Sequence, residues 1–206
     1  QAADAAVMTL TDLPPGWTVA PPEEDDDVDF QYSEQCAALA QETFGGEIAT
    51  ASSDELEGPV QQSLESDASV FNNADEAESV LNQYRSMLSS CQSDLMAAFK
   101  AGFDHGVAKE GANPADFQVQ INWEDQPSPK DVESGLAFRI FGSVTGPGST
   151  FAFAVDFVAF RQGRMVGGLV YTQLGVQLAE EHKNIVRTAA DKLGRVNDSI
   201  VESSGG

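Results

Sequence analysis

The sequence has few positive charges. Its 206 residues include 11 Lys and Arg against 33 Asp and Glu, a formal net charge of −22. A polyanionic surface repels phosphate backbones and anionic lipid headgroups, so we expect no binding to nucleic acid or to a charged membrane surface. We interpret the acidic excess mainly as a solubility feature, although it would also attract cations or basic partners.

Long hydrophobic runs are also missing. No stretch approaches the roughly 20 apolar residues of a membrane-spanning helix. Residues 1–6 lack the basic start and the apolar core of a signal peptide. The chain is therefore either cytoplasmic or the mature form of an exported protein. Because 41% of the residues are hydrophobic, wholesale disorder is not expected.

Cysteine and histidine are scarce, at two residues each. Cys36 and Cys91 lie too far apart for a CxxC redox pair or a local zinc knuckle. A tetrahedral metal site would need both His105 and His182, and neither has finger-like spacing from a cysteine. We predict a disulfide between Cys36 and Cys91, and with it an oxidising compartment; two buried free thiols are the alternative.

Catalytic motifs are absent as well: there is no GxSxG, HExxH, GxxxxGK[ST], or GxGxxG after a strand. His182 lies on an apolar helix stripe between Leu178 and Ile185, which is typical of a core-edge residue. His105 lies in a predicted loop. A hydrolase would need a nucleophile–base pair around this histidine, and the residues near it complete no known motif. We therefore predict no enzyme activity, no catalytic residues and no cofactor.

The acidic run Glu23–Asp29 has aspartates at alternate positions, as the first ligands of an EF-hand loop do. Phe30 stands where that loop needs glycine, however, and Cys36 where it needs a bidentate glutamate. The run is not an EF-hand, and we predict a solvated loop without a metal site. A looser cation site is the alternative.

Apolar residues at helical spacing predict a weak helix over Ala5–Leu13, one or two turns at Cys36–Ala40, and an amphipathic helix over Val176–Leu193. Asn73 and the acids after it indicate the start of a long helix that runs to Cys91. Leu95–Phe103 either continues that helix or forms another short one. The predicted loop that contains His105 runs from Asp104 to Asp116.

Alternating apolar residues and turn signals predict several strands. They are Trp17–Ala20, Glu47–Ser53, Val60–Phe71, Phe117–Trp123, Leu136–Val144, Thr150–Phe160 and Met165–Thr172. The short connections between the later strands favour an antiparallel meander. The predicted fold class is α+β: an antiparallel sheet of about five to seven strands with two long helices packed mainly on one face. Residues 1–200 form one domain, and residues 201–206 form a flexible tail.

The aromatic residues of the strands are too many for one face of a small sheet, and most are expected in the core. A sheet face left open by the helices could still line a groove. There we predict a ligand site at Trp123, Arg139, Arg161 and Tyr171, because scarce arginines beside aromatics would orient an anionic or amphipathic ligand.

Several motifs follow one another in a familiar order. They are Leu10–Thr18 (LTDLPPGWT), a cysteine some twenty residues later, the strand Ala68–Phe71, a helix from Ala74 to Cys91, and a closing helix over Leu178–Leu193. This order resembles the actinobacterial extracytoplasmic sensor-like domains. These occur as envelope lipoproteins and as the extracellular part of the mycobacterial kinase PknH.

The resemblance implies an antiparallel sheet with helices around a cleft, a place in the cell envelope, and ligand sensing without catalytic residues. Cys36 and Cys91 match one disulfide of that family, while a second disulfide of some members is missing here. If the chain comes from a lipoprotein, its lipid anchor lies upstream of Gln1.

Two functions follow as hypotheses. The first is an envelope binding module whose cleft takes a small or amphipathic ligand. The second is an accessory or assembly subunit docked on a larger membrane protein complex. An apolar cleft near Trp123, Arg139 and Tyr171 would favour the first, and a large exposed apolar patch without a pocket the second.

Overall fold

The computed structural model describes residues 2–21, 33, 36, 47–175 and 179–204. The acidic run Glu23–Asp29 lies outside the described residues, as do Leu178 and, apart from Cys36 itself, the turns expected at Cys36–Ala40.

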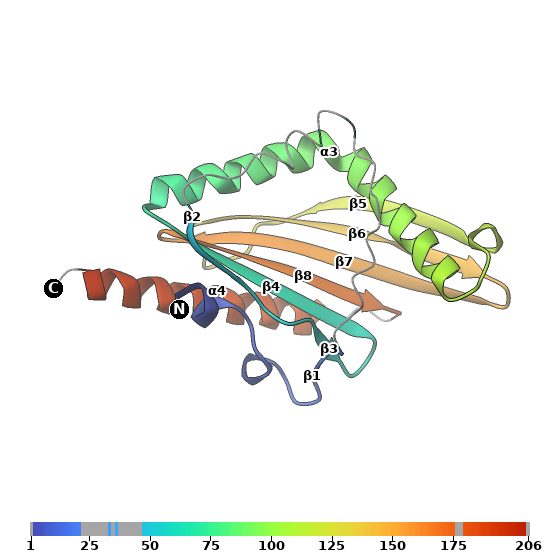
Figure 1. The fold of residues 1–206 in the computed structure, drawn as a ribbon, viewed down its shortest axis with the longest axis horizontal. Coiled ribbons are helices and arrows are strands. Elements are labelled where there is room, and N and C mark those ends of the chain that lie inside the picture. The colour runs from blue at the N-terminus through green and yellow to red at the C-terminus, as the bar shows by residue number, and fades with distance from the viewer. Residues whose placement is uncertain (1, 22–32, 34–35, 37–46, 176–178, 205–206) are drawn as a thin grey trace.

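The described residues form one antiparallel sheet of eight strands (Figure 1). The order of its strands is β1-β3-β4-β8-β7-β6-β5. β3 pairs with the first part of β4, and β2 pairs with the last part of the same strand. The strands are β1 (Thr18–Val19), β2 (Glu47–Ser52), β3 (Leu56–Gly58), β4 (Gln62–Phe71), β5 (Gln118–Gln126), β6 (Ser134–Gly146), β7 (Ser149–Gln162) and β8 (Met165–Leu174). The α+β class and the antiparallel meander are confirmed.

The central hairpins follow from turn chemistry. β6 and β7 are joined where Gly146 pairs with Ser149. Gly148 in that turn has a φ of 89°, a conformation that costs glycine little.

The number of strands exceeds the expected five to seven because β3 is only three residues long, too short for a visible alternation.

The helical elements are α1 (Ala2–Ala6), η1 (Leu10–Asp12), α3 (Ala74–Lys109), η2 (Pro114–Asp116) and α4 (Ala179–Ser204). α1 and η1 take the place of the single helix expected over Ala5–Leu13. α3 starts as predicted, since the Asn73 side chain accepts a hydrogen bond from the backbone N–H of Glu76.

α3 also decides how the chain continues after Cys91. Leu95–Phe103 belongs to the same helix, which then runs through the expected loop as far as Lys109. His105 is therefore an exposed helical residue. At the other end of the chain, α4 continues past Leu193 to Ser204, into the segment expected as a tail.

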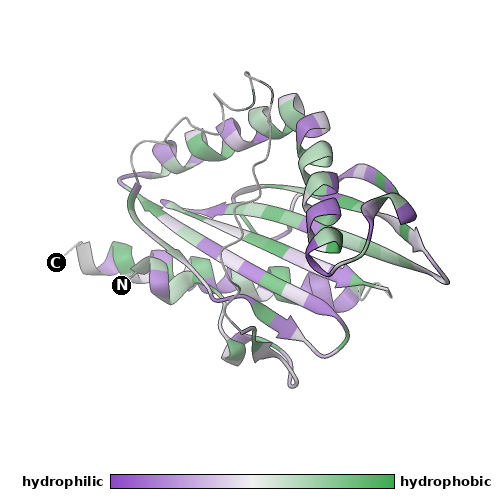
Figure 2. Cartoon of the chain, turned by 45° about the vertical axis from the view of Figure 1, so that its right-hand side comes forward, coloured by the Kyte–Doolittle hydropathy of each residue, from purple (hydrophilic) through white to green (hydrophobic). Residues whose placement is uncertain are grey.

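The two long helices cover opposite faces of the sheet, not mainly one face as expected. The C-terminal part of α3 crosses in front of the strands, and α4 passes behind them (Figures 1 and 2). The reason lies in strands such as β7, which is apolar on both sides: Phe153 and Phe157 face α3, while Val158 and Phe160 face α4. Strands apolar on both faces require cover on both.

The largest hydrophobic cluster lies on the α4 face. It joins the N-terminal segment and α4 to the sheet through Met8, Trp17, Leu64, Phe160, Ile185 and Leu193, among others. Two smaller clusters lie on the α3 face. One surrounds Phe71 and Val80, and the other surrounds Phe138 and Phe153.

Candidate ligand-binding cavity

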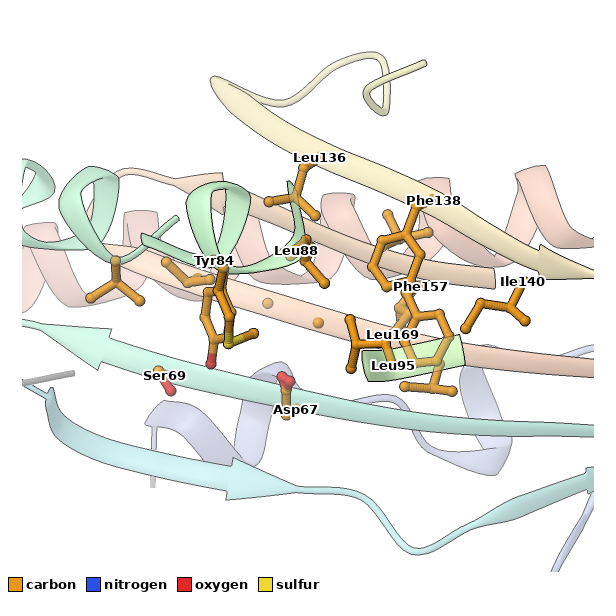
Figure 3. A pocket seen from close by; sticks show the side chains of 18 of the residues that line it. Asp67, Ser69, Tyr84, Leu88, Leu95, Leu136, Phe138, Ile140, Phe157 and Leu169 are labelled. Atoms are coloured by element: carbon orange, nitrogen blue, oxygen red, sulfur yellow. The ribbon is translucent and has the colours of Figure 1, made fainter. Parts of the chain in front are cut away.

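A cavity of about 650 Å³ lies between α3 and the sheet. Its walls come from α3, β4, β6, β7 and β8, with Glu47 of β2 (Figure 3). Most of the lining is apolar and includes Leu88, Leu95, Phe138, Ile140, Phe157 and Leu169. The volume lies in the range of roughly 300 to 1,000 Å³ that suits small-molecule ligands.

The hollow exists because α3 meets the sheet at its two ends. Near the helix N-terminus, Val80 packs with Phe71. Toward the C-terminus, Phe99 stacks on Phe153 with ring centroids 5.2 Å apart. Between these contacts the strands carry small residues, so α3 spans the gap without filling it.

Two of the small residues, Gly168 and Ala159, are neighbours in one row across the sheet, in which Gly168 pairs with Asp67 and Ala159 pairs with Leu136. All four line the cavity. A Cβ added at Gly168 would collide with both carboxylate oxygens of Asp67. The missing side chain at Gly168 therefore leaves the space that the Asp67 carboxylate occupies.

Polar groups gather at one end of the cavity: Glu47, Asp67, Ser69 and Tyr84. Asp67 and Ser69 rise from β4, and the hydroxyl of Tyr84 points down from α3 toward that strand (Figure 3). Ser69 Oγ donates to Glu47 Oε1 at 3.3 Å. The described lining residues include no Lys, Arg or His.

Electrostatics at this end disfavour negative charge. Burial raises the pKa of Asp67, and the nearby charge of Glu47 raises it further. Asp67 is exposed to solvent at this end of the cavity, although the protein atoms around its carboxylate are close enough to raise its pKa. Burial also raises the pKa of Tyr84, and the charges of Asp67 and Glu47 add to this effect. A ligand that brought positive charge would relieve the repulsion.

The four ligand-binding residues predicted from the sequence do not form one site. Trp123 lies on the α3 face and stacks on Phe138, with ring centroids 4.1 Å apart. Phe138 lines the cavity, so Trp123 supports its wall from behind. The indole Nε1 donates to Asp125 Oδ1 at 2.9 Å.

Arg139 and Tyr171 lie on the opposite face, under α4. Arg139 donates twice to Asp156, at 2.6 and 2.9 Å, and Asp156 is only 1% exposed. Tyr171 is fully buried and accepts hydrogen bonds from Gln62 and Gln173 at 2.8 and 3.0 Å. Both residues are part of the core on the far side of the sheet from the cavity.

Arg161 anchors the first part of α3. Its Nε donates to Glu78 Oε2 of that helix at 2.8 Å, and its Nη1 forms an ion pair with Glu133 at 2.5 Å. The bond from Ser134 Oγ to the same Glu78 oxygen lowers the pKa of Glu78, and the charge of Arg161 lowers it further. Arg161 therefore fixes one end of the cavity roof.

The disulfide joins Cys36 to Cys91 in the middle of α3, with Cα atoms 5.7 Å apart and a sequence separation of 55. Both cysteines are buried. Cys91 stands between Leu88 and Leu95, which line the cavity, so the bridge ties the helical roof to the segment before β2.

The part of the chain that the structure describes contains no group of three His, Cys, Asp or Glu side chains able to hold a metal ion. None of its helices is long and apolar enough to cross a membrane.

His182 sits in the core behind the sheet, not in the cavity. Its ring stacks on Tyr171 at 5.1 Å, and its Nδ1 lies 3.8 Å from Asp156 Oδ2. Burial lowers the pKa of His182; Asp156 raises it in part, and Arg139 lowers it again. Folding therefore disfavours the charged imidazole.

We expect the free energy of unfolding to fall as the pH drops below about 6.5, the ordinary pKa of histidine, because the unfolded chain then binds a proton that folded His182 resists. His182→Gln should reduce this dependence. Guanidinium unfolding of both proteins between about pH 5 and about pH 7.5 measures this dependence. Identical pH profiles would show that His182 is not responsible.

A comparison with solved structures finds the extracellular domain of PknH from Mycobacterium tuberculosis, at 11% sequence identity and a TM-score of 0.49. The match covers 94% of this chain and 95% of that domain. No protein-family model matches the chain, and no curated protein does.

Proposed function

We propose that this protein is a non-catalytic, extracytoplasmic binding domain of the sensor-like type, which takes a small or amphipathic ligand in the cavity under α3. The observation that carries the proposal is the cavity itself: about 650 Å³, mostly apolar, with its polar groups at one end. A pocket with a large apolar surface and a few convergent polar groups is the usual form of a ligand site.

The disulfide supports the extracytoplasmic part of the proposal, because such bridges persist in oxidising compartments. A lipoprotein anchor upstream of Gln1 would hold the domain at the outer face of the cytoplasmic membrane. The accessory-subunit hypothesis is the alternative. A native mass spectrum of protein from its own envelope separates the two: a small-molecule adduct supports the binding domain, and a mass found only with other subunits supports the alternative.

Partly filling the cavity should weaken the binding of an apolar probe. Ala98 of α3 lines the cavity. We expect Ala98→Trp to raise the Kd of Nile red, an uncharged dye that fluoresces in apolar surroundings, by at least about tenfold, or about 1.4 kcal/mol of binding free energy. A fluorescence titration of the purified protein gives the Kd.

Ala97→Trp is the matched control, because Ala97 is the preceding residue of the same helix and is exposed. It adds the same side chain outside the cavity and should leave the Kd unchanged. Circular dichroism checks that both variants keep their secondary structure. If the wild type does not bind the dye, or if both tryptophan variants bind it equally well, the cavity is not a binding site.

A further inference from the structure

We infer that the cavity selects amphipathic molecules with a cationic, primary-amine head and an apolar tail. This inference rests on the proposed function, and adds to it the chemistry of the ligand. The tail would lie against the apolar walls, and the ammonium group would lie beside the carboxylate of Asp67 at the polar end.

The distribution of polar groups supports a ligand with one polar end. Asp67, Ser69 and Tyr84 are close together where the first half of α3 passes over β4 (Figure 3), and Glu47 of the neighbouring strand β2 accepts a hydrogen bond from Ser69. Phe138, Ile140 and Phe157 form the apolar wall away from them (Figure 3). A molecule with polar groups at both ends would bury one end against aromatic rings without hydrogen-bond partners, which is unfavourable.

The sign of the charge distinguishes an amine from an acid or a phosphate. Two of the four polar groups are carboxylates, and none of the described lining residues is basic. The chain as a whole carries a formal net charge of −22, so its field also favours a cation. An anionic head would meet repulsion from Glu47 and Asp67 without a compensating donor of positive charge.

Gly168 shows that the sheet makes room for this carboxylate. Asp67 and Gly168 are direct cross-strand partners, and the Asp67 oxygens lie where a side chain at position 168 would begin. Glycine in a strand interior weakens the strand, and often marks a place where another group must approach closely. Here that group is the carboxylate that would receive the ammonium head.

A matched series of twelve-carbon amphiphiles tests the head group: dodecylamine, dodecanol and dodecanoate, each titrated below its critical micelle concentration at neutral pH and followed by calorimetry. We expect the wild type to bind dodecylamine about tenfold more tightly than dodecanol, because a hydrogen bond to a charged group contributes more than a neutral one. Dodecanoate should bind most weakly.

Two variants act on the carboxylate. Asp67→Asn should raise the Kd of dodecylamine about tenfold and leave that of dodecanol unchanged. The variant is expected to fold, because burial and Glu47 make the charged form of Asp67 unfavourable in the folded state. Gly168→Ala keeps the charge but displaces the carboxylate, so it should weaken dodecylamine binding in the same direction.

Two further variants are controls. Glu57→Gln removes one negative charge from an exposed position on β3 and should change nothing. Ala98→Trp partly fills the cavity and should weaken the binding of dodecylamine. Dodecylamine binding that is unchanged in Ala98→Trp would show attraction to the acidic surface and would overturn the inference.

The remaining outcomes distinguish a failure of the proposed preference for an amine head group from a failure of the proposed binding function. If dodecanol binds as tightly as dodecylamine, or if Asp67→Asn behaves like the wild type, the amine preference is wrong while the binding function stands. If dodecanoate binds most tightly, the charge assignment is wrong as well. If none of the three amphiphiles binds to the wild type, the proposed function itself is overturned.

Discussion

Arg139→Met is expected to lower the free energy of unfolding by about 3 to 5 kcal/mol, the usual effect of breaking a buried ion pair from one side. The Asp156 carboxylate is almost completely buried, and Arg139 donates two hydrogen bonds to it. Methionine keeps much of the apolar stem of arginine but leaves the carboxylate without that partner. Guanidinium unfolding followed by circular dichroism measures the loss.

The double variant Arg139→Met/Asp156→Leu is the matched control. With both charges replaced by apolar side chains, the stability should return to near the wild-type value, or exceed it, because paired buried charges contribute little net stability. Nile red binding should not change in the double variant, since both residues lie on the face away from the cavity. A loss below about 1 kcal/mol in Arg139→Met would show that the pair is not important to the core.

Removing the disulfide is expected to lower the free energy of unfolding by about 4 kcal/mol, the loop-closure value for a bridge that closes 55 positions of chain. Cys36→Ser/Cys91→Ser should therefore unfold at a clearly lower guanidinium concentration than the wild type. The bridge joins α3 to the segment before β2, so the unfolded chain gains much freedom when it is cut.

A reducing agent provides the control for this pair. It should lower the unfolding midpoint of the wild type toward that of the double serine variant, and should leave the variant unaffected. The intact mass of the untreated protein should be two hydrogens below that of the reduced chain. A wild type that does not respond to reduction and shows the mass of free thiols would contradict both the bridge and the oxidising compartment.

The fold was largely predictable because its signals are local. The Asn73 cap, the alternation in Phe117–Trp123 and the glycine turn at Gly148 each specify an element from a few adjacent residues. The faces covered by the helices could not be predicted in the same way. β7 is apolar on both sides, and only the three-dimensional path of α3 and α4 decides which helix covers which side.

The site was harder to predict than the fold. Asp67 and Ser69 alternate with buried residues on β4. This pattern is typical of a strand with one side facing the core and the other facing solvent. They line a cavity only because α3, which follows later in the sequence, passes over them in the folded chain. The pair Gly167–Gly168 was the available signal, because two glycines inside an apolar strand indicate a place where another group approaches closely.

The sequence analysis placed Arg139 and Arg161 in a ligand site because arginine is scarce in this chain. The structure gives a physical reason why scarce arginines lie elsewhere. In a chain with so few basic side chains, the carboxylates compete for them. Arg139 neutralises Asp156 in the core, and Arg161 binds Glu78 and Glu133 at the end of α3. The cations hold the structure together, and the cavity retains the uncompensated acids.

The sheet separates two kinds of surface that can change at different rates during evolution. The face under α4 holds the largest cluster of the core, whereas the middle of the face under α3 is empty space. Substitutions at cavity positions such as Ala98 or Leu136 alter the shape of the hollow while the α4 core keeps the strands in place. A lineage with this architecture could acquire a new ligand through a handful of changes beneath one helix.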